Sequence, residues 1–216
     1  MKKLLVMGLI LVASLNMAPG VTPAYAKPHH NHECISQSEV KFENQFRRLW
    51  VDHVLWTSNY ITSATTAGAE DQKDVLERLL RNQEDIGNSI KPVYGEEAGN
   101  KLTALLKEHI VIAGDIVQAA KDGNKAKLDQ LNKAWFKNAD DIAAFLSKAN
   151  PNLKNEQLKE LLYKHLQMVA DDLSASLKKD WGARIVSIDD GMSHIIMMSD
   201  TISTAVVKQF PDKFKK

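Results

Sequence analysis

Four histidines share one place in a repeating pattern, and imidazole is a side chain that binds metals and transfers protons. They are His53, His109, His165 and His194, each near the middle of a predicted helix. Because the midpoints of all helices in an up-and-down bundle lie at one level, these positions predict a single polar layer at mid-height. The three- and four-residue spacing of neighbouring apolar residues places the imidazoles on the buried sides of their helices.

Alignment of the predicted helices on one another extends the pattern. The histidine column also holds Asn82 and Trp135, and a column six residues further on always holds Asn or Asp. Six residues turn a helix by about 240°, so an Asp cannot share a site with the histidine of its own helix. Asp115, Asp171 and Asp200 could instead orient imidazoles of adjacent helices. The period of 26 to 30 residues indicates an internal helix repeat.

Three interpretations of the layer stay open. The layer could be a hydrogen-bonded polar stratum that fixes helix register, with Asn82 and Trp135 donating into it. It could be a transition-metal or haem site with the four histidines as ligands. It could also be a catalytic or small-ligand pocket without a metal. After residue 26 the sequence has no Glu-x-x-His or His-x-x-x-His pair, so each metal ligand would come from a different helix.

The segment before the predicted helices contains a second set of metal-binding side chains. His29, His30, His32 and Cys34 lie within six residues, a combination that could chelate Cu, Ni or Zn. Pro28 lacks the amide hydrogen that an amino-terminal copper site would lose. We therefore expect a disordered, weakly chelating leader over residues 27–38.

Six helices must position the histidines. Apolar residues recur at three- and four-residue spacing almost to the end of the chain, and no stretch alternates as a strand does. Turn residues such as Asp122-Gly123-Asn124 separate the helices. The predicted helices span residues 39–66, 71–92, 97–121, 125–148, 155–179 and 183–209. Short loops predict an all-α, up-and-down bundle of antiparallel helices over residues 39–210, followed by a solvated tail over 211–216.

Three residues inside the predicted helices affect helix geometry or packing. Pro92 should kink or end the second helix. Gly87 and Gly114 each cost about 1 kcal/mol relative to alanine in a helix. We expect these glycines where helices approach closely or where a ligand needs space.

The first 26 residues have the layout of a secretory signal peptide. Lys2 and Lys3 precede an apolar run over residues 4–15, and Ala24-Tyr25-Ala26 supplies a cleavage site. The apolar run is too short to span a bilayer. We expect cleavage after Ala26 and a secreted product, extracellular or periplasmic, without a membrane span.

Composition argues against a nucleic-acid-binding protein and against a fold held by disulfides. The chain has 28 Lys and Arg against 27 Asp and Glu, which gives no basic surface for nucleic acid. Cys34 is the only cysteine, so packing and not an intramolecular disulfide must stabilise the fold.

A resemblance to a known family rests on the segments LWVDHVLWTSNYI, NQEDIGNSIKPVYG, LTALLKEHI, WFKNADDIAAFL and KQFPDKF. These resemble a family of bacterial helical proteins, often exported, over roughly residues 45–214. Members carry labels such as acetylglutamate kinase or glycosyltransferase, which need α/β folds and nucleotide-binding loops. This sequence predicts no strand and no phosphate-binding loop. The resemblance transfers no functional residue.

The sequence therefore predicts an exported, non-enzymatic binding protein whose mid-bundle layer takes a transition metal or small ligand. The alternative is a structural or cell-surface interaction protein, in which the layer only fixes register. An enzyme would require a solvent-connected cavity beside the layer. The sequence does not identify a protein partner.

Overall fold

The computed structural model describes residues 35–215, and this part of the chain is helical without any strand. The helices are α1 (Gln37–Thr65), α2 (Gln72–Tyr94), α3 (Glu96–Lys121), α4 (Lys125–Ala149), α5 (Asn155–Lys178), α6 (Trp181–Gln209) and the 3₁₀ helix η1 (Pro211–Phe214). The predicted all-α bundle is thus confirmed. None of these helices combines the length and apolarity needed to cross a membrane.

Local sequence explains where the helices begin and end. Ser36, Asn124 and Asp180 are the N-caps of α1, α4 and α6, and each side chain accepts a backbone N–H three residues on. Gly95 ends α2 with a φ of 90°, which favours glycine. Pro92 lies in the last turn of α2, so the helix continues only two residues beyond it.

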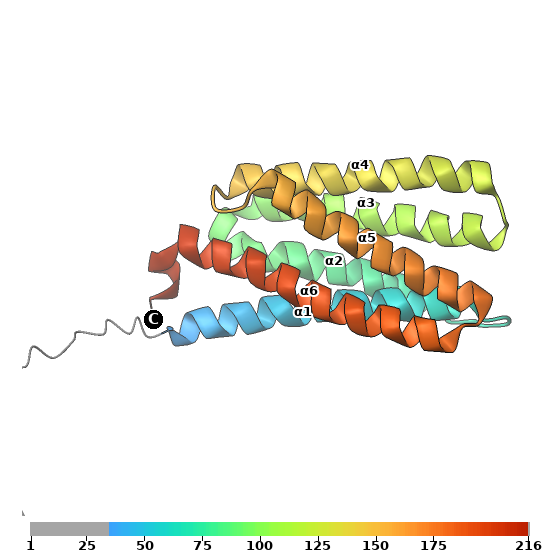
Figure 1. Cartoon of the computed structure of the whole chain (residues 1–216). Coiled ribbons are helices and arrows are strands. Elements are labelled where there is room, and N and C mark those ends of the chain that lie inside the picture. The colour runs from blue at the N-terminus through green and yellow to red at the C-terminus, as the bar shows by residue number, and fades with distance from the viewer. Residues whose placement is uncertain (1–34, 216) are drawn as a thin grey trace, which may run out of the picture. The chain divides into compact units, whose positions relative to one another are not determined.

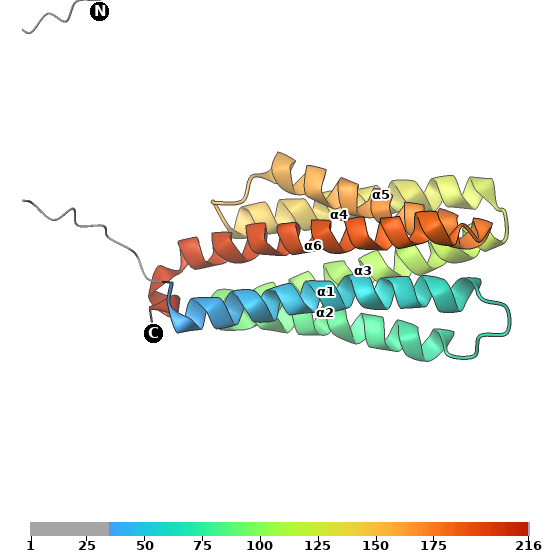
Figure 2. The same ribbon diagram turned by 60° about the horizontal axis from the view of Figure 1, so that its bottom comes forward.

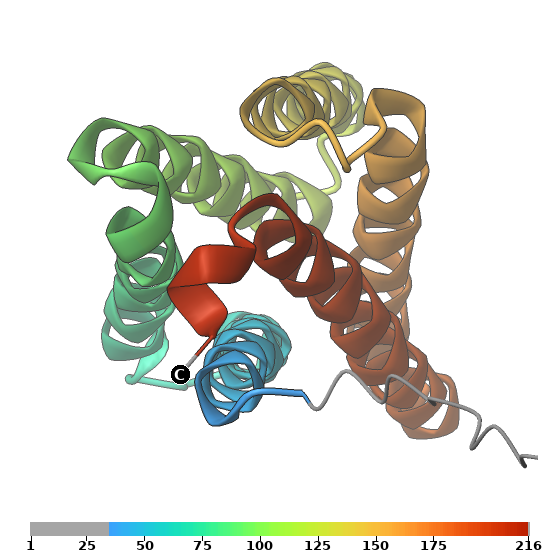
Figure 3. The same ribbon diagram turned by 90° about the vertical axis from the view of Figure 1, so that its left-hand side faces the viewer.

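The helices lie side by side, and the turns that connect them lie at alternating ends (Figures 1 and 2). Each helix packs against the next one in the chain, and α6 packs against α1, which closes the ring of contacts. The end-on view shows α1 between α2 and α6 (Figure 3). Because α1 also contacts α5, a side chain on the inner face of α1 can meet one on α5.

Residues 211–214 of the predicted solvated tail form η1, in which Pro211, Asp212 and Lys213 are exposed. Phe214 is buried, and its ring lies 5.1 Å from the ring of Phe42. Ser38 Oγ donates to the Phe214 carbonyl (2.7 Å), and Lys213 Nζ donates to the Pro92 carbonyl (2.8 Å). Burial of one aromatic ring therefore holds the end of the chain against α1 and α2.

The two helix glycines noted in the sequence lie at close contacts. A Cβ on Gly87 would stand 2.6 Å from the carbonyl oxygen of Gly99, so the backbones of α2 and α3 nearly touch there. A Cβ on Gly114 would stand 3.3 Å from the hydroxyl of Tyr60. Gly191 in α6 is different, because a Cβ there would meet nothing within 4 Å.

Alanine substitutions at Gly87 and Gly191 should have opposite effects. We expect Gly87→Ala to destabilise the protein by about 1–3 kcal/mol, since the new methyl group collides with backbone. Gly191→Ala should stabilise it by roughly 0.5–1 kcal/mol, because alanine restricts the unfolded chain more and meets no obstacle. Urea unfolding of both variants checks this, and equal effects would contradict the assigned packing.

Candidate functional site: the buried polar layer

Three helix pairs, α1–α2, α3–α4 and α5–α6, are each joined by a hydrogen bond from a buried side chain of the second helix to a backbone carbonyl of the first. The three donor and acceptor pairs are Asn82 with Leu49 (2.9 Å), Asn138 with Leu105 (3.1 Å) and His194 with Leu161 (2.8 Å). Donor and acceptor are 33 residues apart in every case. We call these the cross-hairpin bonds.

The cross-hairpin bonds recur at an interval of 56 residues, and so do three of the histidines. The donors are residues 82, 138 and 194, and the acceptor carbonyls are those of residues 49, 105 and 161. Each acceptor lies four residues before His53, His109 or His165. The three hairpins thus share these spacings, and by them Asn138, not Trp135, corresponds to Asn82 and His194.

Three of the four predicted histidines lie together around His165. The Nε2 atoms of His53 and His165 are 3.4 Å apart, so the N–H of one ring donates a hydrogen bond to the other. The rings of His109 and His165 are stacked, with centroids 6.2 Å apart. All four histidines are buried.

Hydrogen bonds fix the protonated nitrogen on two of the rings. The Asn138 amide donates to the Leu105 carbonyl, so its oxygen accepts from Nδ1 of His109 (2.9 Å). Neutral His109 therefore carries its proton on Nδ1. His194 donates from Nε2 to the Leu161 carbonyl, which leaves its Nδ1 without a proton when the ring is neutral.

The layer favours neutral imidazole. Burial, and then the neighbouring His109, lower the pKa of His53 to about 3. Burial lowers the pKa of His109 to about 4, and the hydrogen bond that His109 donates to Asn138 opposes this shift. Burial, and then the three other histidines, also lower the pKa of His165. As the pH falls below 6.5, these histidines bind protons in the unfolded chain but remain neutral in the folded one. The free energy of unfolding therefore falls by about 1.4 kcal/mol for each histidine and each pH unit until the pH reaches the lowered pKa of the folded ring.

The other residues predicted to surround the histidines do not make the predicted contacts. Asp115 and Asp171 are exposed, and Asp200 is paired with Arg47 (2.8 Å), so none of the three is hydrogen-bonded to a described imidazole. The ring of Trp135 packs on His109 at 5.2 Å, while its Nε1 lacks a hydrogen-bond partner among residues 35–215. The leader residues His29, His30, His32 and Cys34 lie outside the described residues.

Of the four predicted metal ligands, only His53 and His165 have ring nitrogens within hydrogen-bonding distance of each other. Within the described part of the chain, no three His, Cys, Asp or Glu side chains are placed to share one ion. Asn138 and the Leu161 carbonyl take up one nitrogen each of His109 and His194. The pair formed by His53 and His165 is therefore the place where two imidazole nitrogens already face each other.

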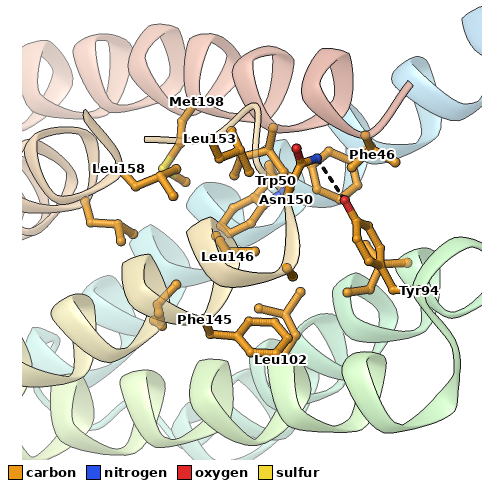
Figure 4. A pocket seen from close by; sticks show the side chains of 16 residues that line it. Phe46, Trp50, Tyr94, Leu102, Phe145, Leu146, Asn150, Leu153, Leu158 and Met198 are labelled. Carbon is orange, nitrogen blue, oxygen red and sulfur yellow. Dashed lines mark hydrogen bonds between the residues drawn. The ribbon is translucent and has the colours of Figure 1, made fainter. Parts of the chain in front are cut away.

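An apolar pocket is lined by residues of all six α-helices (Figure 4). Trp50, one turn before His53, lines it, and the indole and imidazole centroids are 5.7 Å apart. The Asn150 amide closes the pocket by donating to the Tyr94 hydroxyl (2.9 Å). Its volume of about 20 Å³ holds roughly one water molecule. The pocket as it stands is too small for an organic ligand.

A groove between α1, α5 and α6 is lined by His165. Its lining residues are Val54, Thr57, Ser58, His165, Met168, Val169, Asp172, Ser187, Ile188 and Gly191. Arg184 Nε stands 3.0 Å from the buried Asp172 carboxylate, and its Nη2 donates to Ser58 Oγ (2.8 Å) and Thr62 Oγ1 (2.7 Å). Burial raises the pKa of Asp172, and Arg184 opposes this. The charge on Asp172 is thus already compensated.

No protein-family model, curated protein or solved structure matches this chain.

Asn138 was missed by the sequence analysis, although its 56-residue spacing from Asn82 could have revealed it. Asn138→Ala removes the partner of the His109 N–H and the second hydrogen bond to the Leu105 carbonyl. We expect a loss of about 1–3 kcal/mol in the free energy of unfolding. The matched control is exposed Asn59→Ala, which should change it by less than about 0.5 kcal/mol. Equal losses in urea unfolding would rule out a special role for Asn138.

Proposed function

We propose that this chain is an exported, non-enzymatic binding protein that holds one transition-metal ion between His53 and His165. The observation that carries the proposal is the 3.4 Å separation of their Nε2 atoms. Two nitrogens on a tetrahedral ion with bonds of 2.0–2.1 Å stand about 3.3–3.4 Å apart, which is longer than the roughly 3.0 Å typical of hydrogen bonds from N–H donors. The pair is therefore already spaced as two metal ligands are.

The protonation of the pair also supports metal binding. Neutral imidazole is the form that ligates metals, and burial keeps His53 and His165 neutral at neutral pH. The ion has to displace only the one proton that the two Nε2 atoms share, and this proton can move to Nδ1 of its own ring.

The space around the layer argues for an ion and against a substrate. The groove beside His165 has a volume of about 20 Å³, and the space beside Trp135 about 30 Å³. Each holds roughly one water molecule. An enzyme would need room for an organic substrate beside its catalytic groups.

A purely structural layer is the second candidate, and the cross-hairpin bonds favour it. They satisfy Asn82, Asn138 and His194 without any ligand and fix the register of each hairpin. The two candidates differ in their requirement for His53 and His165, because a structural layer needs no metal at that pair.

Metal titration of the full chain separates the two candidates. His29, His30 and His32 are changed to Ala and Cys34 to Ser in every sample, so that the leader cannot chelate. Cu(I), held in a competing chelator without oxygen, and Zn(II) are then added in turn. We expect one ion per chain and a higher melting temperature, because the ion binds only the folded state.

Single variants in this background assign the ligands. His53→Gln or His165→Gln should weaken binding by at least about 100-fold, since each removes a ligand. His194→Gln is the matched control and should bind nearly as well, because glutamine can still donate to the Leu161 carbonyl. No bound ion in a folded chain, or equal binding by all variants, would leave the layer purely structural.

A further inference from the structure

The third hairpin departs from the other two at the position that faces His165. Residues 79, 135 and 191 are equivalent by the 56-residue interval. Leu79 and Trp135 are both buried, and the ring of Trp135 covers His109. The third member is Gly191, where a Cβ would meet no atom within 4 Å. Gly191 is itself buried, and its missing side chain leaves unfilled space in the groove beside His165.

Other equivalent positions change in the same direction. Tyr60 and Ile116 in the first two hairpins correspond to Asp172 in the third, and Val75 and Leu131 correspond to Ser187. Asp172, Ser187 and Gly191 all line the groove. At these three positions the third hairpin has a smaller or polar side chain. Val169 and Ile188 also line the groove and do not follow this trend, since Val169 corresponds to Thr57 and Ala113, and Ile188 to Leu76 and Asn132.

The groove offers one further metal ligand close to the pair. Met168 lies three residues after His165, on the same face of α5, and both line the groove. Asp172 lies seven residues from His165, about 10 Å along the helix, and is held by Arg184. It is too far away to share an ion with the imidazoles, so the groove supplies a thioether and no free charge.

On the basis of the proposed function, we propose that this groove is the entrance to the histidine pair and selects Cu(I), with Met168 as a third ligand. A thioether and two imidazoles suit soft Cu(I). The desolvation cost of an ion rises with the square of its charge, so Cu(I) is buried at about a quarter of the cost of Zn(II). Within residues 35–215, no carboxylate is placed to share one ion with His53 and His165 and so offset a second charge.

Two variants in the leader-substituted background separate the entrance from the ligand. Gly191→Leu restores the side chain of the first hairpin and should slow Cu(I) loading about tenfold or more, because the groove must open first. Gly191→Ala is its control and should load at the original rate. Met168→Leu keeps the volume but removes the sulfur, and should weaken Cu(I) binding about 10–100-fold while Zn(II) binding stays unchanged.

A readout without metal tests the entrance by itself. Deuterium exchange at the imidazole C2–H, followed for each histidine by mass spectrometry, should slow at His165 in Gly191→Leu and stay unchanged at His109. Unchanged exchange and loading in Gly191→Leu, together with an unchanged ion preference in Met168→Leu, would overturn this inference while leaving the histidine pair as the metal site. If the parent chain binds neither ion, the proposed function fails and this inference with it.

Discussion

The structure depends on one interaction that is made three times, a hydrogen bond from a buried side chain in the second helix of a hairpin to a backbone carbonyl in the first. The acceptor is always the carbonyl four residues before His53, His109 or His165. A carbonyl oxygen has two lone pairs, so it can serve this bond beside its helical one. A register shift would break the bond and leave a buried donor unsatisfied, at about 1–3 kcal/mol for each hairpin. Hairpin register and histidine height are therefore set together.

A layer fixed in this way holds the imidazoles away from solvent, and this burial determines their protonation state. Ionised rings of His53, His109 and His165 are disfavoured because these side chains are buried and lie close to one another. His109 and His194 each use one nitrogen in a hydrogen bond to a residue that is not a histidine. His53 and His165 instead face each other between α1 and α5.

Periodicity was sufficient to predict the helices, and it also placed the four histidines on buried faces. Turn residues fixed the helix boundaries to within about two residues, because caps act locally. The polar partners required tertiary information. Aligning single helices put Trp135 where the hairpin interval puts Asn138, and it gave Asp115, Asp171 and Asp200 a role beside imidazoles. Solvent exposure and the ion pair with Arg47 place these carboxylates on the outside instead. Phe214 was assigned to a solvated tail because its partner, Phe42, lies at the other end of the sequence.

The most direct test of the layer is nitrogen NMR of the imidazoles in the metal-free chain, titrated from neutral to acid pH. We predict that His53, His109 and His165 remain neutral at about pH 5, where an ordinary histidine is charged. His109 should carry its proton on Nδ1 and His194 on Nε2, and a coupling should connect the Nε2 atoms of His53 and His165. Titration of any of the first three near pH 6.5, or a proton on Nε2 of neutral His109, would contradict the account.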